Sequence, residues 1–261
     1  MKLDVWGVEA SPFLLKLEAL LNYRGIGFRR LPRDGGRWHN MVTALRLRRA
    51  RKRRVVQRYP VMGRLDEYPA VPYLIADGRE FHYDSSAIAL WLDSQQAATP
   101  RPYYPPDPEC GFLASQIDEA FDEFGLYMVH HMRWVGSARS VTMGDFTARE
   151  MGPLLPPGGR RLLARRLYRR QAGRCPYLFS VAPQGFDAGV DTSRTPPSQP
   201  GFPATHELLE ANWRAYLAAL EEVLCVQPFL LGQRFTLADA SACGQFGMNM
   251  ADPEAADLMR Q

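Results

Sequence analysis

Hydrophobic positions near the start of the chain change from a strand-like pattern to a helix-like pattern and back. Leu3–Trp6 is a short apolar run of the kind that forms a strand. Ser11 and Pro12 then mark a helix start, after which leucines recur at helical spacing and form one apolar face. Ile26–Leu31 is predicted as a second strand. Because strand, helix and strand follow in this order, we expect a right-handed parallel crossover.

A β-hairpin and another helix are predicted further along the chain. Val71–Ala76 and Arg79–Tyr83 are strand-like runs on either side of Asp77-Gly78, a pair that favours a two-residue turn. Asp84-Ser85-Ser86 supplies side chains that cap helices, and an apolar helical run follows it. In the stretch before the hairpin, the sequence predicts a basic helix over about residues 38–58.

The remaining sequence predicts helices separated by two proline-rich stretches. Residues 94–108 contain five prolines and no hydrophobic period, which indicates a linker. Residues 173–203 contain six prolines and are expected to form a long irregular loop. Helices are predicted over about residues 109–136, 159–172 and 204–226, and from Thr236 onward.

These patterns together predict an α/β domain followed by an all-helical domain. The first domain spans residues 1–93 and includes a basic insertion at about 38–68. The second spans residues 109–261 and lies beyond the linker. Thr236 and Asp239 have the spacing of a capping box, which supports the start of a helix there.

Composition excludes several protein classes. Hydrophobic residues make up 46% of the chain and charged residues 23%, as in ordinary globular proteins. No apolar stretch approaches the roughly 18 residues that a membrane-spanning helix needs. The first residues carry charges within a short apolar run and lack a cleavage site, so no secretory signal is expected. We therefore expect a cytoplasmic protein with no transmembrane segment.

The cysteines and histidines give no metal site. The four cysteines form no Cys-x-x-Cys pair, and none has a histidine at the spacing of zinc ligands, so they are interpreted as structural thiols. His130 and His131 point about 100° apart on the predicted helix and are not expected to share a metal.

Positive charge is concentrated in two segments. Residues 46–58 hold eight Lys and Arg residues, and residues 160–174 hold seven Arg residues, with no acidic residue in either segment. The whole chain carries a net charge of only +4, so its remainder is acidic. The first segment suits nucleic acid or an anionic membrane, and the second, as an amphipathic basic helix, suits a membrane surface. A solvated or partner-facing surface is preferred for the first, and docking onto the helical domain for the second. No nucleic-acid partner is expected, since no nucleic-acid-binding motif accompanies the charges.

Three segments of the sequence resemble the glutathione transferases. They are Val5–Phe13, with its Ser-Pro helix start; Val71–Leu74 together with Tyr83–Ile88; and Phe229–Ala240, which contains the Thr-x-x-Asp box. The resemblance implies a serine-type, thioredoxin-like N-terminal domain and a helical C-terminal domain. It also implies a cis bond before Pro72, glutathione as co-substrate, and a homodimer. Residues 32–68 and 137–203 lie outside the resemblance.

The resemblance assigns a role to several residues. Ser11 is the candidate catalytic residue, because its hydroxyl and the helix N-terminus would stabilise the glutathione thiolate. The backbone of Val71, before cis Pro72, would pair with the cysteinyl part of glutathione. Asp84 and Ser85 would hold the γ-glutamyl ammonium and carboxylate groups. The alternative is structural in each case: Ser11 and Ser85 cap their own helices, and Pro72 is an ordinary trans proline.

The function expected from this resemblance is conjugation of glutathione to a hydrophobic electrophile. Tyr127 and Trp134 lie seven residues apart on one predicted helix and are candidates for the electrophile pocket, with core packing as the alternative. The competing hypothesis is a non-catalytic scaffold of the same fold that binds anionic or protein partners through its basic segments.

Overall fold

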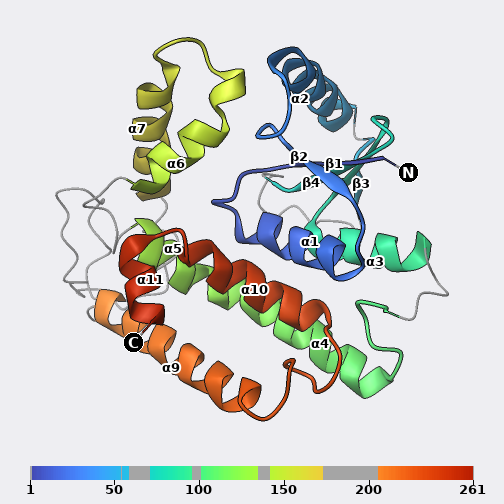
Figure 1. Ribbon diagram of the computed structural model, residues 1–261, viewed down its shortest axis with the longest axis vertical. Helices are drawn as coiled ribbons and strands as arrows, with labels where there is room; N and C mark the ends of the chain where they lie inside the picture. The colour runs from blue at the N-terminus through green and yellow to red at the C-terminus, as the bar shows by residue number, and fades with distance from the viewer. Residues whose placement is uncertain are drawn as a thin grey trace.

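A five-stranded mixed sheet organises the N-terminal domain (Figure 1). The computed structural model describes residues 2–53, 55–58, 71–95, 101–134, 142–172 and 205–260. In spatial order the strands are β2 (Phe28–Leu31), β1 (Leu3–Trp6), β4 (Tyr73–Ala76), β5 (Glu80–Tyr83) and β3 (Gln57–Arg58). β1 runs parallel to β2 and antiparallel to β4, so the expected parallel crossover is confirmed.

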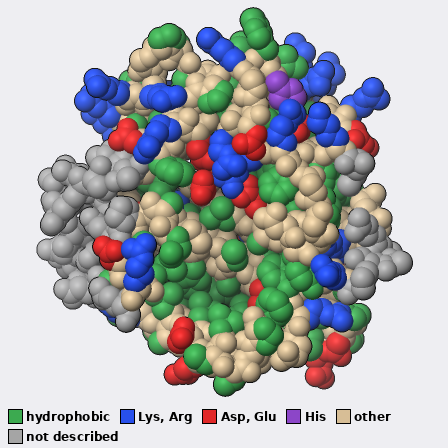
Figure 2. Space-filling view, in the orientation of Figure 1, with side chains coloured by type: hydrophobic (Ala, Val, Ile, Leu, Met, Phe, Trp, Pro, Cys, Tyr) green, Lys and Arg blue, Asp and Glu red, His purple; other side chains and the backbone are tan. Residues whose placement is uncertain are grey.

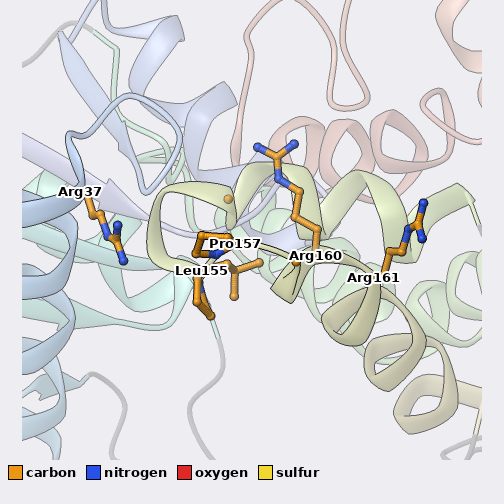
Figure 3. Close-up of a pocket in the computed structure, with 8 residues that line it drawn as sticks. Arg37, Leu155, Pro157, Arg160 and Arg161 are labelled. Carbon is orange, nitrogen blue, oxygen red and sulfur yellow. The ribbon is translucent and has the colours of Figure 1, made fainter.

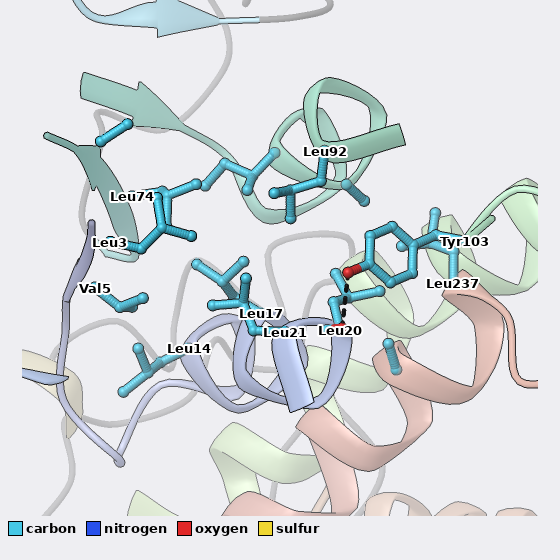
Figure 4. Packing of buried hydrophobic residues seen from close by; sticks show 14 residues of the cluster. Leu3, Val5, Leu14, Leu17, Leu20, Leu21, Leu74, Leu92, Tyr103 and Leu237 are labelled. Atoms are coloured by element: carbon cyan, nitrogen blue, oxygen red, sulfur yellow. Dashed lines mark hydrogen bonds between the residues drawn. The ribbon is translucent and has the colours of Figure 1, made fainter. Parts of the chain in front are cut away.

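Helices cover both faces of this sheet. Leu3 and Val5 of β1 point to the face covered by α1 (Pro12–Tyr23) and α3 (Ser85–Gln95), where leucines of α1 fill the core (Figure 4). Tyr73 and Ile75 of β4 point to the opposite face, which α2 (Arg37–Lys52) covers. The alternation of side chains along a strand thus separates two apolar layers.

Two sequence predictions in this domain are corrected. The basic helix expected to reach residue 58 ends at Lys52, and residues 57 and 58 instead pair with β5 as the edge strand β3. The hairpin between β4 and β5 has a three-residue connection rather than a two-residue turn, because Ala76 pairs with Glu80. Asp77 and Gly78 both adopt positive φ there, as the sequence pair suggested.

The described helices of the C-terminal domain pack against one another, and one of them, α10, packs along α1. They are α4 (Pro108–Ala120), a π-helical turn η1 (Phe121–Gly125), α5 (Leu126–Trp134), α6 (Thr142–Glu150), the short η3 (Gly152–Leu154), α7 (Gly159–Ala172), α9 (Thr205–Leu224), α10 (Leu237–Asn249) and α11 (Pro253–Met259). None of the helices in these described ranges is long and apolar enough to span a bilayer.

The long helix expected over about residues 109–136 is interrupted by a π turn, and its phenylalanines do not all lie on one buried face. Phe121 is buried, whereas Phe112 and Phe124 are each 64% exposed. The insertion of a wider turn changes the phase of the helix, so a single 3.6-residue period cannot describe both halves. The helix starts expected near 159, 204 and 236 are confirmed, and Thr236 and Asp239 form the predicted capping box.

The two domains meet where α10 crosses α1. A Cβ atom added at Gly244 would lie only 2.4 Å from the carbonyl oxygen of Pro12, so the helices approach at a point where only glycine fits. Tyr103, in the segment before α4, inserts into the N-terminal core and donates from its hydroxyl to the carbonyl of Leu20 at 2.8 Å (Figure 4). The interface is therefore closely packed.

Helices α6 and α7 form a hairpin that the sequence only half predicted. A Cβ atom at Gly144 of α6 would lie 2.7 Å from the carbonyl oxygen of Ala164 of α7, and α7 also contacts α5, so the expected docking of α7 onto the helical domain is confirmed. The hairpin reaches across to the N-terminal domain beside α2 (Figure 1). The loop predicted over 173–203 and the central part of the linker, residues 96–100, lie outside the described residues.

Candidate functional site

Three paired strand residues, one on each of β1, β4 and β5, show that the segments predicted to form the site adjoin the sheet at neighbouring positions. Trp6 pairs with Tyr73, and Tyr73 pairs with Tyr83. The end of β1, the start of β4 and the end of β5 therefore lie side by side at one edge of the sheet. The segments attached to this edge are the loop that leads to Ser11, the Val71–Pro72 bond, and the Asp84–Ser85 helix start.

Ser11 caps the N-terminus of α1, as the sequence predicted. Its Oγ accepts a hydrogen bond from the backbone N–H of Leu14 at 3.4 Å, and the residue is 7% exposed. This bond uses a lone pair of the hydroxyl oxygen and leaves its proton for donation to another acceptor. Capping α1 and donating to a thiolate are thus compatible roles for one side chain.

The bond between Val71 and Pro72 is cis, which confirms the expectation drawn from the resemblance. A second cis bond, which was not expected from the sequence, joins Leu31 to Pro32 at the end of β2. Leu31 pairs with Trp6, so this second proline follows the same row of strand ends.

Asp84, rather than Ser85, caps helix α3. Its Oδ1 accepts from the backbone N–H groups of Ser86 at 2.9 Å and Ala87 at 3.2 Å, and its backbone has a φ of 72°. Ser85 occupies the first helical position, is 1% exposed, and its Oγ has no hydrogen-bond partner among the described residues. The alternative reading of Ser85 as the cap of its own helix is therefore wrong, since that function belongs to its neighbour.

Next to Ser85, a buried charge cluster joins the two domains. Lys16 of α1 donates to Ser86 Oγ at 2.7 Å and to Asp122 Oδ2 at 2.6 Å, and it also pairs with Asp118. Asp118 in turn accepts from the hydroxyls of Ser86 and Ser241. The cluster thus connects the first turn of α3 to the helical domain.

The charges and the burial of this cluster shift the pKa values of both Lys16 and Asp122. Although burial alone would lower it, the Asp122 and Asp118 carboxylates raise the pKa of Lys16, which stays charged. Burial, together with the nearby Asp118 carboxylate, raises the pKa of Asp122 to about 7, although the Lys16 ammonium opposes this shift. The sequence did not predict this cluster. Its signal was a lysine within the apolar leucine run of α1.

The loop between β1 and α1 is held by two residues of the helical domain. Glu150, at the end of α6, accepts from the backbone N–H of Glu9 at 2.7 Å. Arg133, at the end of α5, donates to the carbonyl of Ala10 at 2.7 Å. The residues immediately before Ser11 are therefore positioned by side chains distant in the sequence.

Arg30 of β2 links this loop to the rest of the site. It pairs with Glu18 of α1 and with Glu9 at 3.1 Å, and lies 3.6 Å from Glu150. Burial raises the pKa of Glu150 and lowers that of Arg133 to about 9. No sequence signal pointed to Glu150, because helix α6 itself was not predicted.

Tyr127 and Trp134, the candidates for the electrophile pocket, both lie on α5. Tyr127 is half-buried, whereas Trp134 is buried with its ring centroid 6.4 Å from that of His130. A cavity of about 730 Å³ lies elsewhere, between α2 and the start of α7, and Arg37, Leu155, Pro157, Arg160 and Arg161 are among its lining residues (Figure 3). Neither aromatic residue lines that cavity.

Comparison with solved structures gives a consistent result. A glutathione S-transferase of Ceriporiopsis subvermispora in complex with glutathione is 18% identical, with a TM-score of 0.55, over 98% of this chain and 89% of that one. A β-etherase of a Sphingobium strain is 17% identical, with a TM-score of 0.54, over 96% and 84%. A glutathione S-transferase of Sinorhizobium meliloti is 12% identical, with a TM-score of 0.51, over 100% and 87%.

Sequence comparison alone finds no such relatives, since neither a protein-family model nor a curated protein matches the chain. The likeness therefore lies in the three-dimensional arrangement: a thioredoxin-like sheet flanked by helices, with an all-helical domain packed along α1. The protein has the fold of the glutathione transferases.

Proposed function

We propose that this protein binds glutathione and activates its thiol for attack on a hydrophobic electrophile. The observation that carries the proposal is the register row of Trp6, Tyr73 and Tyr83. Through it, a serine hydroxyl, a backbone segment beside a proline and a helix N-terminus come together at one edge of the sheet. Each of these groups suits a different part of one tripeptide.

Ser11 is the proposed catalytic residue. A thiolate placed at the N-terminus of α1 receives a hydrogen bond from the Ser11 hydroxyl and interacts with the positive end of the helix dipole. Both interactions lower the pKa of the bound thiol, so that more of it is the nucleophilic thiolate at neutral pH. Ser11 itself forms no covalent bond in this reaction.

The other proposed contacts hold the glutathione molecule in place and take no part in the chemical step. The buried Ser85 hydroxyl would donate to the γ-glutamyl carboxylate at the N-terminus of α3, where the positive end of the helix dipole also favours an anion. Asp84 keeps one carboxylate oxygen beyond its capping bonds, which would accept from the ligand's ammonium group. The backbone of Val71 would pair with the cysteinyl residue. Tyr127 and Trp134 remain the proposed contacts of the electrophile.

A non-catalytic scaffold is the second candidate, and one observation favours it. The carboxylate of Glu150 occupies the N–H of Glu9, two residues before Ser11, where negative charge opposes a thiolate. Because Glu150 already accepts the hydrogen bond of this loop N–H, the Glu9 loop is held in place without a bound glutathione. We place the transferase first because Ser85 retains an unpartnered buried hydroxyl among the described residues, which a ligand would satisfy.

The deciding experiment combines binding with turnover. Calorimetric titration with glutathione should show binding that Ser85→Ala weakens, and a chloroarene substrate should be conjugated at a rate that depends on Ser11. Ser94→Ala, an exposed serine near the end of α3, is the matched control and should change neither quantity. Absence of both glutathione binding and turnover would exclude the transferase and favour the scaffold.

The proposal also includes a cytoplasmic homodimer, which the resemblance implies. Light scattering coupled to gel filtration would measure the mass directly against the 29.6 kDa of one chain. A single-chain mass at micromolar concentration would contradict the dimer and leave the chemistry proposed for Ser11 unaffected.

A further inference from the structure

Helix α2 turns an apolar stripe towards solvent. Trp38 is 79% exposed, and Met41, Val42 and Leu45 follow at helical spacings of three, four and seven residues with exposures of 38–49%. Residues this far apart lie on one side of a helix. The opposite side of α2, which includes the buried Leu47 and Ala50, packs on the sheet, so both sides of the helix are apolar but only one is covered.

Arginines surround this stripe on the exposed side of α2. All of these basic side chains are exposed, and α2 contains no acidic residue. Among the described residues, no carboxylate forms an ion pair with any of these basic side chains. The basic side chains in and directly after the helix are Arg37, Arg46, Arg48, Arg49, Arg51, Lys52 and Arg53. The helix therefore presents an apolar strip within a field of positive charge.

Helix α7 repeats this combination at the same end of the molecule. Leu162 is 73% exposed, and exposed arginines accompany it, namely Arg160, Arg161, Arg165, Arg166 and Arg169. Lys and Arg side chains gather along the edge formed by α2 and α7, with apolar side chains among them (Figure 2). The cavity with Arg37 on one side and Arg160 on the other lies between the two helices, so the two basic surfaces adjoin (Figure 3).

We propose that the edge formed by α2 and α7 binds the surface of an anionic lipid bilayer. Guanidinium groups would contact lipid phosphates and carboxylates, and the Trp38–Leu45 stripe would enter the boundary between headgroups and acyl chains. Tryptophan is suited to this boundary because its ring is apolar and its N–H is a hydrogen-bond donor.

The apolar stripe is what favours a bilayer over a nucleic acid. A duplex would satisfy the arginines through its phosphates but would leave the Met41, Val42 and Leu45 side chains against a charged backbone. A bilayer satisfies both kinds of side chain at once. The surface does not depend on Ser11 or on glutathione, so this inference stands independently of the proposed transferase activity.

The test is co-sedimentation of the full chain with vesicles. One set contains phosphatidylcholine only, and the other contains phosphatidylcholine with phosphatidylserine. Binding should be strong only to the second set, should decrease with added salt, and should move the tryptophan emission to shorter wavelengths as Trp38 leaves water. Equal behaviour of the two sets, or binding to neither, would overturn the proposal.

Paired variants separate the two parts of the surface. Arg48→Gln with Arg49→Gln should weaken binding about 25-fold, at about fivefold for each charge near the membrane. Trp38→Ala should weaken it about tenfold and abolish the emission shift. The control for the loss of two charges is Arg234→Gln with Arg260→Gln, both at exposed positions outside this surface. The control for the loss of an exposed apolar side chain is Val226→Ala, at a residue that is 81% exposed. Neither control should change vesicle binding.

Two other results would overturn the inference. If Trp38→Ala binds vesicles as well as the native chain, the apolar stripe does not enter the bilayer. If labelled duplex DNA binds with strong salt dependence while phosphatidylserine vesicles do not, the surface recognises nucleic acid. Melting curves by circular dichroism would verify that every variant is folded, which is expected because the changed side chains are exposed.

Discussion

The ammonium group of Lys16 lies 2.6 Å from the carboxylate of Asp122, and this pair joins helix α1 of the sheet domain to the π turn of the helical domain. Asp118 shares the same lysine, so one positive and two negative groups are buried together. The other carboxylate oxygen of Asp122, Oδ1, is buried and has no hydrogen-bond partner among the described residues. The domain interface therefore contains a buried carboxyl group whose pKa is raised above its ordinary value.

The free energy of unfolding should consequently depend on the titration of Asp122. Its pKa is raised to about 7 in the folded state, above about 3.9 in the unfolded chain, so the folded protein binds this proton more tightly. The stabilisation is complete below about pH 4 and is lost as the pH rises through about 7. Asp122→Asn keeps the neutral form, and it should exceed the native chain in stability by more than about 1 kcal/mol at pH 8.

Denaturant titrations at several pH values would measure this difference. The native chain and Asp122→Asn should converge below about pH 4, where the carboxyl is protonated in both the folded and the unfolded chain. The exposed Asp257→Asn is the control and should follow the native curve throughout. A difference between Asp122→Asn and the native chain that stays constant with pH would show that folding does not raise the pKa of Asp122.

Gly244 provides a test of the interface that involves no charge. An alanine Cβ there would lie 2.4 Å from the carbonyl of Pro12 and 3.0 Å from the backbone nitrogen of Lys16, so α1 and α10 would have to separate. Gly244→Ala should lower stability by about 1–3 kcal/mol, which corresponds to a melting temperature lower by roughly 2–10 °C.

Gly247 is the matched control on the same helix. Its added Cβ would meet only Leu15 Cδ1, at an ordinary contact distance of 3.8 Å. Because alanine favours helix over glycine by about 1 kcal/mol, Gly247→Ala should be neutral or stabilising. Similar losses in both variants would mean that the effect comes from α10 itself and not from its contact with α1.

The sequence predicted most elements of the fold but not the contacts that join them. Strand alternation, the Ser11-Pro12 start and the Thr236 capping box are local signals, and the structure has each of them in the expected place. Lys16 and Glu150 act through partners more than 100 residues away, and no periodicity carries that information. Even the helix start at Asp84 was only half predicted, because three adjacent residues can all cap a helix and only backbone geometry chooses among them.

Ser85→Ala should now separate binding from stability more clearly than the sequence suggested. Since Asp84 supplies the cap and the Ser85 hydroxyl is buried without a described partner, its loss should leave the melting temperature unchanged or slightly higher. Glutathione affinity should fall roughly 10- to 150-fold, as expected for one charge-assisted hydrogen bond. Calorimetry and thermal melts would measure the two effects, and an unchanged affinity would remove Ser85 from the proposed site.

Glu150→Gln should increase turnover if glutathione binds beside the Glu9 loop. The amide oxygen can still accept from the Glu9 N–H, but the negative charge next to the proposed thiolate is removed. The pKa of the bound thiol should therefore fall, and the rate near neutral pH should rise by up to about tenfold for one pKa unit. Glu222→Gln, on the exposed side of α9, is the control and should leave the profile unchanged.

Ser11→Ala is the most direct test of the proposed chemistry. The variant loses the donor to the thiolate, so the pKa of bound glutathione should rise, while the contacts of Ser85 and Val71 preserve its affinity. Turnover at neutral pH should fall, and part of it should return at high pH, where the thiol ionises without help.

Stability must be followed alongside, because Ser11 also caps α1 through the Leu14 N–H. Loss of the cap should cost about 0.5–2 kcal/mol, which lowers the melting temperature but does not alter the shape of a pH–rate profile. Ser11→Asn retains a capping side chain with different reach, so it should restore stability without restoring the native thiol pKa. If Ser11→Ala matches the native profile at every pH, Ser11 is only a cap. The thiol would then need another donor, and the Glu9 N–H already donates to Glu150.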